Sequence, residues 1–326
     1  MDIYFVVAEI HGSVGQTDRT IRKKAGKYWD ILCLMCRMKL YLQQMRSLQD
    51  WCGGITVLGS GRREGSSYQY LSFDQASVGA RLDRTCPFFR IADMYVGETT
   101  CDGKKKAWEI LAEDVPVHVM DLPQMKREKD VCSWADEIRE FKKVVEDFTG
   151  NKITAEKLAD SIHMINQKRK ALERLYAFRR NDRLPISGKD VLLISQIAFY
   201  DDPTRFTEMT NKLCDELENR VAEGVSVFPE GTKRIMLTGT PLAIPNWKIH
   251  NLVETSGGAV VCEEMCTGTR YFERLVDETK TTVDEQIELL QKDIWESTVH
   301  VLHQTAQELM ILSAWQKNIK WMELLM

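Results

Sequence analysis

Residues 91–123 read IADMYVGETTCDGKKKAWEILAEDVPVHVMDLP, and the prediction of the fold starts from this stretch. The apolar run 91–96 ends at a glycine, which is typical of a short buried strand. Asp102 and Gly103 can begin a helix that continues through Trp108. Residues 115–120 form a second apolar run, which Pro123 closes. A strand, a helix and a second strand in this order are the building unit of a parallel α/β sheet.

A second unit of the same kind follows later in the chain. Residues 234–239 read RIMLTG, residues 247–255 have a helical pattern, and residues 259–262 read AVVC. Between the two units, apolar residues recur at helical spacing up to Gly150, and Thr154 can open another helix. The sequence therefore predicts an α/β fold with two Rossmann or flavodoxin-like parallel-sheet lobes and a helical insert.

The predicted boundaries divide the chain into four parts. Residues 1–79 would form the N-terminal part of the first lobe, and residues 80–129 the rest of that lobe. Residues 130–225 would form the helical insert, and residues 226–326 an incomplete second lobe. A chain of 326 residues is long enough for such an arrangement.

The composition excludes several classes of partner. A net charge of −4 gives no reason to expect nucleic acid or an anionic membrane as a partner. No apolar run approaches the roughly 18 residues that a membrane-spanning helix needs. The N-terminal residues MDIYFVVAE lack the basic region of a secretory signal, so we expect a cytoplasmic protein.

The chain contains nine cysteines, an odd number without the regular spacing of a disulfide framework. In a reducing compartment, so many cysteines suggest metal ligation or a redox role. The alternative is that most are small buried hydrophobic residues. We favour that alternative for Cys132 and Cys214, which lie in helical patterns. Cys33 and Cys36 form a C-x-x-C without a partner pair, which is a weak signal, and neither they nor Cys52 are given a ligand role.

Cys101 lies where the predicted strand gives way to the predicted helix. The free N–H groups and the partial positive charge of a helix N-terminus lower the pKa of a thiol and stabilise an anionic cluster. Lys104, Lys105 and Lys106 follow in the first turn, where they oppose the helix dipole. Such lysines make more sense as a positive rim around an anionic group. From the spacing alone, a buried structural cysteine beside a solvated basic turn is equally compatible.

Longer motifs around Cys101 resemble a known family. The runs CPFF at 86–89, VGETTCDGKKK at 96–106 and VHVMDLP at 117–123 resemble the D-component of 2-hydroxyacyl-CoA dehydratases and benzoyl-CoA reductases. The nearest branch is that of double-cubane iron–sulfur cluster proteins. The runs LTGTP at 237–241 and EMCTG at 264–268 resemble the second lobe of the same family. The resemblance covers residues 80–290 and implies that Cys86, Cys101 and Cys266 are cluster ligands.

The resemblance also implies a reaction. In this family a separate ATP-hydrolysing iron–sulfur activator protein delivers one electron at very low potential, and a 4Fe–4S or double-cubane cluster passes it on. In the dehydratases, a 2-hydroxyacyl-CoA substrate becomes a ketyl radical and loses water. In the double-cubane branch, the reaction is the reduction of a small molecule. The lysine run and Thr240 are hypothesised to contact an acyl-CoA phosphate or the activator, and a homodimer or a paralogous second subunit is expected.

The two ends of the chain lack further cysteine motifs that the family has. With suitable synonymous codons, residues 65–75 read in another frame give Asp-Leu-Pro-Ile-Asn-Ile-Cys-Pro-Leu-Ile-Lys, which resembles one of them. Residues 293–306 likewise give a segment containing Asn-Cys-Ala-Cys. We therefore hypothesise frame changes near residues 76 and 291 and a truncated C-terminus, with true divergence of both ends as the alternative. A frameshifted and truncated chain would lack part of the cluster ligands and is expected to be inactive.

Two other classes of function stay open. A structural zinc protein could use Cys86, Cys101, Cys262 and Cys266, but only the last two have close spacing, and Cys262 is expected to pack in a strand. The chain could also be a non-catalytic remnant. His118, His163 and His250 lie on or beside predicted elements, and we interpret them as structural histidines rather than bases.

Overall fold

The computed structural model describes the chain in several segments. These are residues 29–31, 48–50, 78, 93–99, 102–123, 125, 127–199, 201–239, 242, 246–265, 267–302 and 323–324. The strands are β1 (Trp29–Ile31), β2 (Leu48–Asp50), β3 (Met94–Glu98), β4 (Val117–Met120), β5 (Lys233–Thr238), β6 (Gly258–Glu264) and β7 (Glu323–Leu324). The helices are α5 (Asp102–Leu111), α6 (Glu128–Thr149), α7 (Ala155–Ala177), η2 (Phe178–Arg180), α8 (Gly188–Ile197), α9 (Pro203–Ala222), α10 (Lys248–Thr255), α11 (Thr269–Phe272) and α12 (Val283–Leu302).

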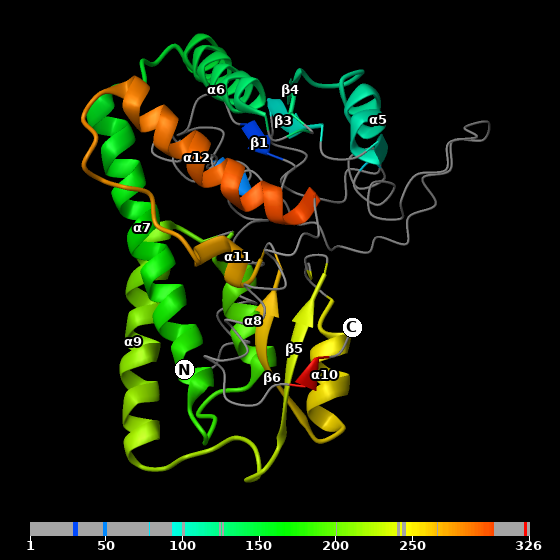
Figure 1. The fold of residues 1–326 in the computed structure, drawn as a ribbon, viewed down its shortest axis with the longest axis vertical. Coiled ribbons are helices and arrows are strands. Elements are labelled where there is room, and N and C mark those ends of the chain that lie inside the picture. Colours follow the sequence, from blue (N-terminus) through cyan, green and yellow to red (C-terminus); the bar gives the residue numbers. More distant parts are fainter. Residues whose placement is uncertain are drawn as a thin grey trace, which may run out of the picture.

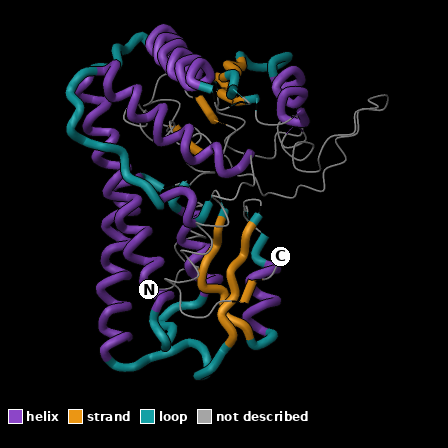
Figure 2. Tube along the Cα trace, in the orientation of Figure 1, coloured by secondary structure: helices purple, strands orange, loops and turns teal. Residues whose placement is uncertain are grey.

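The described strands form two separate sheets (Figure 2). The first has the order β2-β1-β3-β4 and the second the order β6-β5-β7, and every described pairing is parallel. Counted within each sheet, both orders begin 2-1-3, as in flavodoxin-like sheets. The predicted α/β class is thereby confirmed, whereas two flavodoxin-like lobes, one of them incomplete, stay a prediction.

Several predicted helix ends are confirmed. Helix α6 ends before Gly150, which has a φ of 71° and donates its N–H to the carbonyl of Glu146 at 2.8 Å. Helix α7 begins after Thr154, whose hydroxyl accepts the backbone N–H of Lys157 at 3.3 Å. Helix α5 begins at Asp102, the residue that the sequence marks as its start.

Strands β3 and β6 end later than the sequence predicts, whereas β4 covers only Val117–Met120 of the predicted run 115–120. Strand β3 continues past Gly97 to Glu98, and β6 continues to Glu264. Gly97 does not end its strand, because its missing side chain makes room for an aromatic ring. A Cβ atom there would lie 2.3 Å from Cε2 of Trp108. The glycine therefore allows α5 to pack closely on the strand that precedes it.

Helix α7 connects the two parts of the fold (Figure 1). It contacts α9 and also packs against α8, α11 and α12. Helix α12 lies in the sequence range predicted for the second lobe, yet it packs against α6 and α7. Arg139 of α6 reinforces this contact with Asp284 and Glu288 of α12, at 3.6 and 3.9 Å. No local sequence pattern predicts this long-range contact.

Candidate functional site

Two of the three predicted ligands, Cys101 and Cys266, follow β3 and β6 in the chain, and the carboxyl ends of parallel strands are where α/β sheets usually present ligands. Cys101 immediately precedes α5, and Cys266 lies between the described residues Met265 and Thr267. The cysteines Cys86, Cys101 and Cys266, together with Thr240, lie outside the described residues. The described residues nearest in the chain to Cys101, Thr240 and Cys266 belong to β3, α5, β5 and β6 or lie next to them, and these residues define the surroundings of the site.

Hydrogen bonds hold the end of β3 against the end of β4. The hydroxyl of Thr99 donates to Asp121 Oδ1 at 2.7 Å and accepts the backbone N–H of Leu122 at 2.9 Å. The indole N–H of Trp108 donates to the carbonyl of Glu98 at 3.0 Å. The end of β3 is thus attached through Thr99 to the neighbouring strand and through Glu98 to α5.

The predicted lysine rim lies in the first turns of α5. Lys105 Nζ is 3.4 Å from Asp102 Oδ1, and Lys106 pairs with Glu109 on the same helix. The side chain of Lys104 lies outside the described residues, although its backbone belongs to α5. Both described lysines stay partly solvent-exposed, so these surface pairs leave them able to meet an anion.

A similar arrangement holds the ends of β5 and β6. The hydroxyl of Thr238 donates to Glu264 Oε2 at 2.6 Å, and Arg270 Nη2 donates to the same oxygen at 2.7 Å. The hydroxyl of Thr269 donates to the carbonyl of Glu263 at 3.1 Å. A Cβ on Gly268 would lie 2.2 Å from that carbonyl oxygen, so the turn needs glycine. In both sheets, a threonine at one strand end therefore donates to a carboxylate at the end of the adjacent strand.

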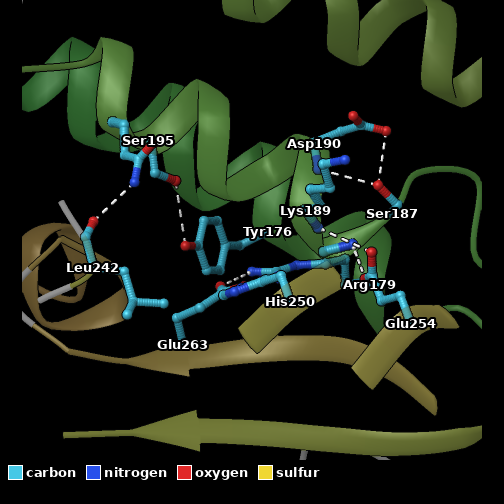
Figure 3. A network of polar contacts seen from close by, with 12 residues as sticks. Tyr176, Arg179, Ser187, Lys189, Asp190, Ser195, Leu242, His250, Glu254 and Glu263 are labelled. Atoms are coloured by element: carbon cyan, nitrogen blue, oxygen red, sulfur yellow. Dashed lines mark hydrogen bonds and ion pairs between the residues drawn. The ribbon is translucent and has the colours of Figure 1, made fainter. Parts of the chain in front are cut away.

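A buried ion pair includes Glu263, a residue near the end of β6 (Figure 3). Arg179 of η2 donates to both oxygens of Glu263 at 2.9 and 2.8 Å, and His250 Nε2 lies 2.9 Å from Glu263 Oε1. Both side chains of the pair are 1% exposed. Burial alone would raise the pKa of Glu263, but the positive charge of Arg179 and the hydrogen bond to His250 lower it to about 2. The carboxylate therefore stays ionised inside the protein.

The three histidines make contacts of different kinds. His250 is fully buried and belongs to the ion pair just described. His118 stacks on Phe141 with ring centroids 5.4 Å apart, and burial lowers its pKa. His163 is exposed on α7, where its Nδ1 lies 2.8 Å from Glu278 Oε2. Each thus contributes to packing or to a local contact, as the structural interpretation requires.

The described cysteines separate into two kinds. Cys214 and Cys262 are buried, and burial raises the pKa of their thiols to about 11 and about 12 respectively. Such thiols are poor metal ligands, because ligation needs the thiolate. Cys132 is exposed, so the prediction that it is buried was wrong. It lies two positions before Trp134, outside the apolar stripe of α6.

Cys262 bears on the zinc alternative. It packs with Leu184, Met236, Ala259 and Val261 in an apolar cluster, as the sequence suggested for a strand residue. The described residues contain no group of three potential metal ligands. Cys33, Cys36 and Cys52 lie outside the described residues. A zinc site that includes Cys262 would have to draw its thiolate out of an apolar cluster, which makes this alternative less favourable.

A cavity of about 90 Å³ lies between α7 and β6. Tyr176, Val261, Cys262 and Phe272 contribute to its lining. Pockets that hold drug-sized ligands have volumes of roughly 300–1,000 Å³. This cavity is therefore too small for an acyl-CoA, and the strand ends remain the better candidate site.

Within the described residues, no helix is both long enough and apolar enough to cross a bilayer.

The chain is similar to a known protein family and to a curated protein. A family model described as "2-hydroxyglutaryl-CoA dehydratase, D-component" matches residues 61–312. A curated protein of Escherichia coli (strain K12), named "Putative dehydratase subunit YjiM", is 35% identical over 216 residues. That alignment covers 64% of this chain and 55% of the relative, so the chain spans about half the length of that protein.

Proposed function

Because this chain belongs to the family of the 2-hydroxyglutaryl-CoA dehydratase D-component, we propose that it is the iron–sulfur subunit of a 2-hydroxyacyl-CoA dehydratase-like enzyme. Membership supports a dehydratase subunit in general terms. The cluster, the electron transfer and the acyl-CoA substrate are the further content of the proposal.

The observation that carries the proposal is the position of Cys101. It comes three residues after the end of β3 and directly before α5 in the chain, and the first turns of this helix of 10 residues carry three lysines. Free backbone N–H groups and nearby lysines favour a thiolate and an anionic cofactor at this place. The surroundings that are described thus fit an iron–sulfur cluster.

In this proposal, Cys86, Cys101 and Cys266 hold the cluster, which when bound supplies one-electron transfer at low potential. The protein contributes the fixed strand ends, held by Thr99 and Thr238. The electron comes from a separate ATP-hydrolysing activator protein. The second subunit is a copy of this chain or a paralogue.

In this proposal, the lysines of α5 and Thr240 contact the substrate or the activator protein. Ammonium groups at the site bind either a phosphate of an acyl-CoA or an acidic surface of the activator. The double-cubane alternative uses the same cysteines for the reduction of a small molecule. Product analysis with a 2-hydroxyacyl-CoA distinguishes the two, because only dehydration releases an unsaturated acyl-CoA.

Anaerobic reconstitution of the full chain with iron and sulfide tests the cluster. We expect bound iron and sulfide with visible charge-transfer absorption, both lost in Cys101→Ala. Cys132→Ala is the matched control, because this exposed cysteine lies on α6 and should leave iron binding unchanged. Iron binding that Cys101→Ala does not reduce would refute the ligand assignment, and stoichiometric zinc in place of iron would favour the structural alternative.

A triple variant, Lys104→Ala, Lys105→Ala and Lys106→Ala, tests the contact surface. We expect weaker activator binding or a higher KM for the acyl-CoA, and a smaller dependence of either on salt concentration. The control is Lys212→Ala, which removes an exposed lysine of α9. Unchanged kinetics and binding in the triple variant would show that the lysine run contacts neither.

A further inference from the structure

The side chain of Gln196 bridges two parts of the polypeptide at the carboxyl edge of the second sheet. Gln196 lies on α8 and is 3% exposed. Its Nε2 donates to the carbonyl of Leu242 at 2.8 Å, and its Oε1 accepts the indole N–H of Trp247 at 3.0 Å. Leu242 lies in the segment between β5 and α10, and Trp247 is the residue before α10. One buried amide thus attaches this segment to α8 at two points.

Both partners are satisfied at once only by a side chain that donates one hydrogen bond and accepts another, as the amide of Gln196 does. The carbonyl of Leu242 can only accept a hydrogen bond, and the indole N–H of Trp247 can only donate one. The two partners therefore also fix which way the amide of Gln196 points. An ionised carboxylate would accept from Trp247 but would repel the carbonyl, and an aliphatic side chain would leave both groups unsatisfied.

The same segment packs against the turn that follows β6. Leu242 forms a buried cluster with Leu192 of α8 and Met265, and Trp247 packs against that cluster. Met265 is the residue before Cys266. Helix α8 therefore supports both the segment after β5 and the turn after β6.

We infer that Gln196 is a positioning residue that fixes Leu242 and Trp247 against Met265, and thereby the spacing between the described residues that follow β5 and β6. This spacing matters for catalysis only if the proposed function is right, because Thr240 and Cys266 belong to that proposal. The positioning itself is a property of the described contacts and can be measured without any activity.

Hydrogen–deuterium exchange of the full chain tests the inference with Gln196→Leu and Gln196→Glu. Near pH 9, both variants should raise exchange of the backbone amides in 237–250 and in 263–270 by about tenfold, because two hydrogen bonds are lost. Burial keeps a carboxyl group at this position protonated at about pH 5, where it can again donate to Leu242. The Glu variant should therefore recover protection at the lower pH, after correction for intrinsic exchange, whereas the Leu variant should not.

The matched control is Tyr176→Phe, which removes the neighbouring buried contact between Tyr176 and Ser195, 3.3 Å long, and should leave both segments protected. Unchanged exchange in both Gln196 variants would overturn the inference. So would faster exchange in 237–250 alone, because the link to the turn after β6 would then be absent. Iron and sulfide analysis of the same samples tests the proposed function separately, since a wild-type chain without iron contradicts that function but not the role of Gln196.

Discussion

Removing Arg179 should destabilise the protein more than removing an ordinary surface charge. In the native state, Arg179 makes two hydrogen bonds to the carboxylate of Glu263, and both side chains are 1% exposed. Arg179→Met leaves that carboxylate buried, with His250 as its remaining partner in the ion pair. Breaking a buried pair in this way typically costs about 3–5 kcal/mol of unfolding free energy. For a protein of this size, that corresponds to a decrease in Tm of roughly 10 °C.

The stability lost in Arg179→Met should depend on pH, and the pKa of Glu263 determines the direction of that dependence. In the wild type, the pKa of Glu263 is about 2, below its ordinary value of 4.5, so its stabilising effect is present above pH 4.5 and is lost as the pH falls towards 2. Without Arg179, burial raises the folded-state pKa above the ordinary value, because burial is then the main influence left. Protonation of Glu263 therefore reduces the loss of unfolding free energy in the variant. The difference in stability between wild type and Arg179→Met should shrink as the pH is lowered from 7 to about 4.

Urea unfolding followed by circular dichroism at several pH values measures the effect. Arg179→Lys is the matched control, since it keeps the charge but not the two-point geometry, and should lose less stability. The double variant Arg179→Met with Glu263→Leu should lose less than the sum of the single variants, by about 2 kcal/mol. A loss below about 1 kcal/mol, or a difference that does not depend on pH, would refute the reasoning.

Three further predictions concern other parts of the chain. Gly97→Ala should lower the stability by about 1–3 kcal/mol, measured by urea unfolding, because its Cβ would overlap the ring of Trp108; Trp108→Leu should remove most of that penalty. The pKa of Glu146 is about 2, since hydrogen bonds from Lys142, the backbone of Ile153 and Lys152 outweigh its burial, so Glu146→Gln should flatten the decrease in Tm between about pH 4.5 and pH 2. The nucleotide sequence should permit the alternative reading frames near residues 76 and 291. Codons that are incompatible with those frames would favour true divergence of the two ends, and the family match over 61–312 is compatible with that alternative.

Local signals in the sequence predicted much of the helical structure. Gly150 and Thr154 mark helix ends because each satisfies backbone groups within a few residues, and such short-range chemistry is visible in the sequence. The burial of Cys262 was also visible, from its place in an apolar strand. The exposure of Cys132 could have been read from its place beside the apolar stripe of α6, and our prediction overlooked this.

The contacts that hold the candidate site could not be predicted in the same way. Arg179 and Glu263 are 84 residues apart in the chain, and Gln196 and Leu242 are 46 apart. A charged residue on a helical segment normally indicates a solvent-exposed face, so the sequence favours an exposed Arg179. Only the packing of η2 and α10 around β6 brings the partners together. The threonine–carboxylate pairs at the strand ends could not be predicted either, because their partners are 22 and 26 residues apart in the chain.

These contacts determine how a failure to bind iron should be interpreted. In small zinc domains the metal ligands supply much of the folding free energy, and the apoprotein unfolds. Here, Thr99 and Trp108 hold the end of β3, and Thr238 and Thr269 hold the end of β6 and the turn after it. Because these hydrogen bonds involve no cluster, the strand ends should keep their arrangement in the apoprotein. A folded chain that binds no iron would thus indicate missing ligands rather than a collapsed site, whereas a large increase in Tm on reconstitution would show that the cluster itself organises these strand ends.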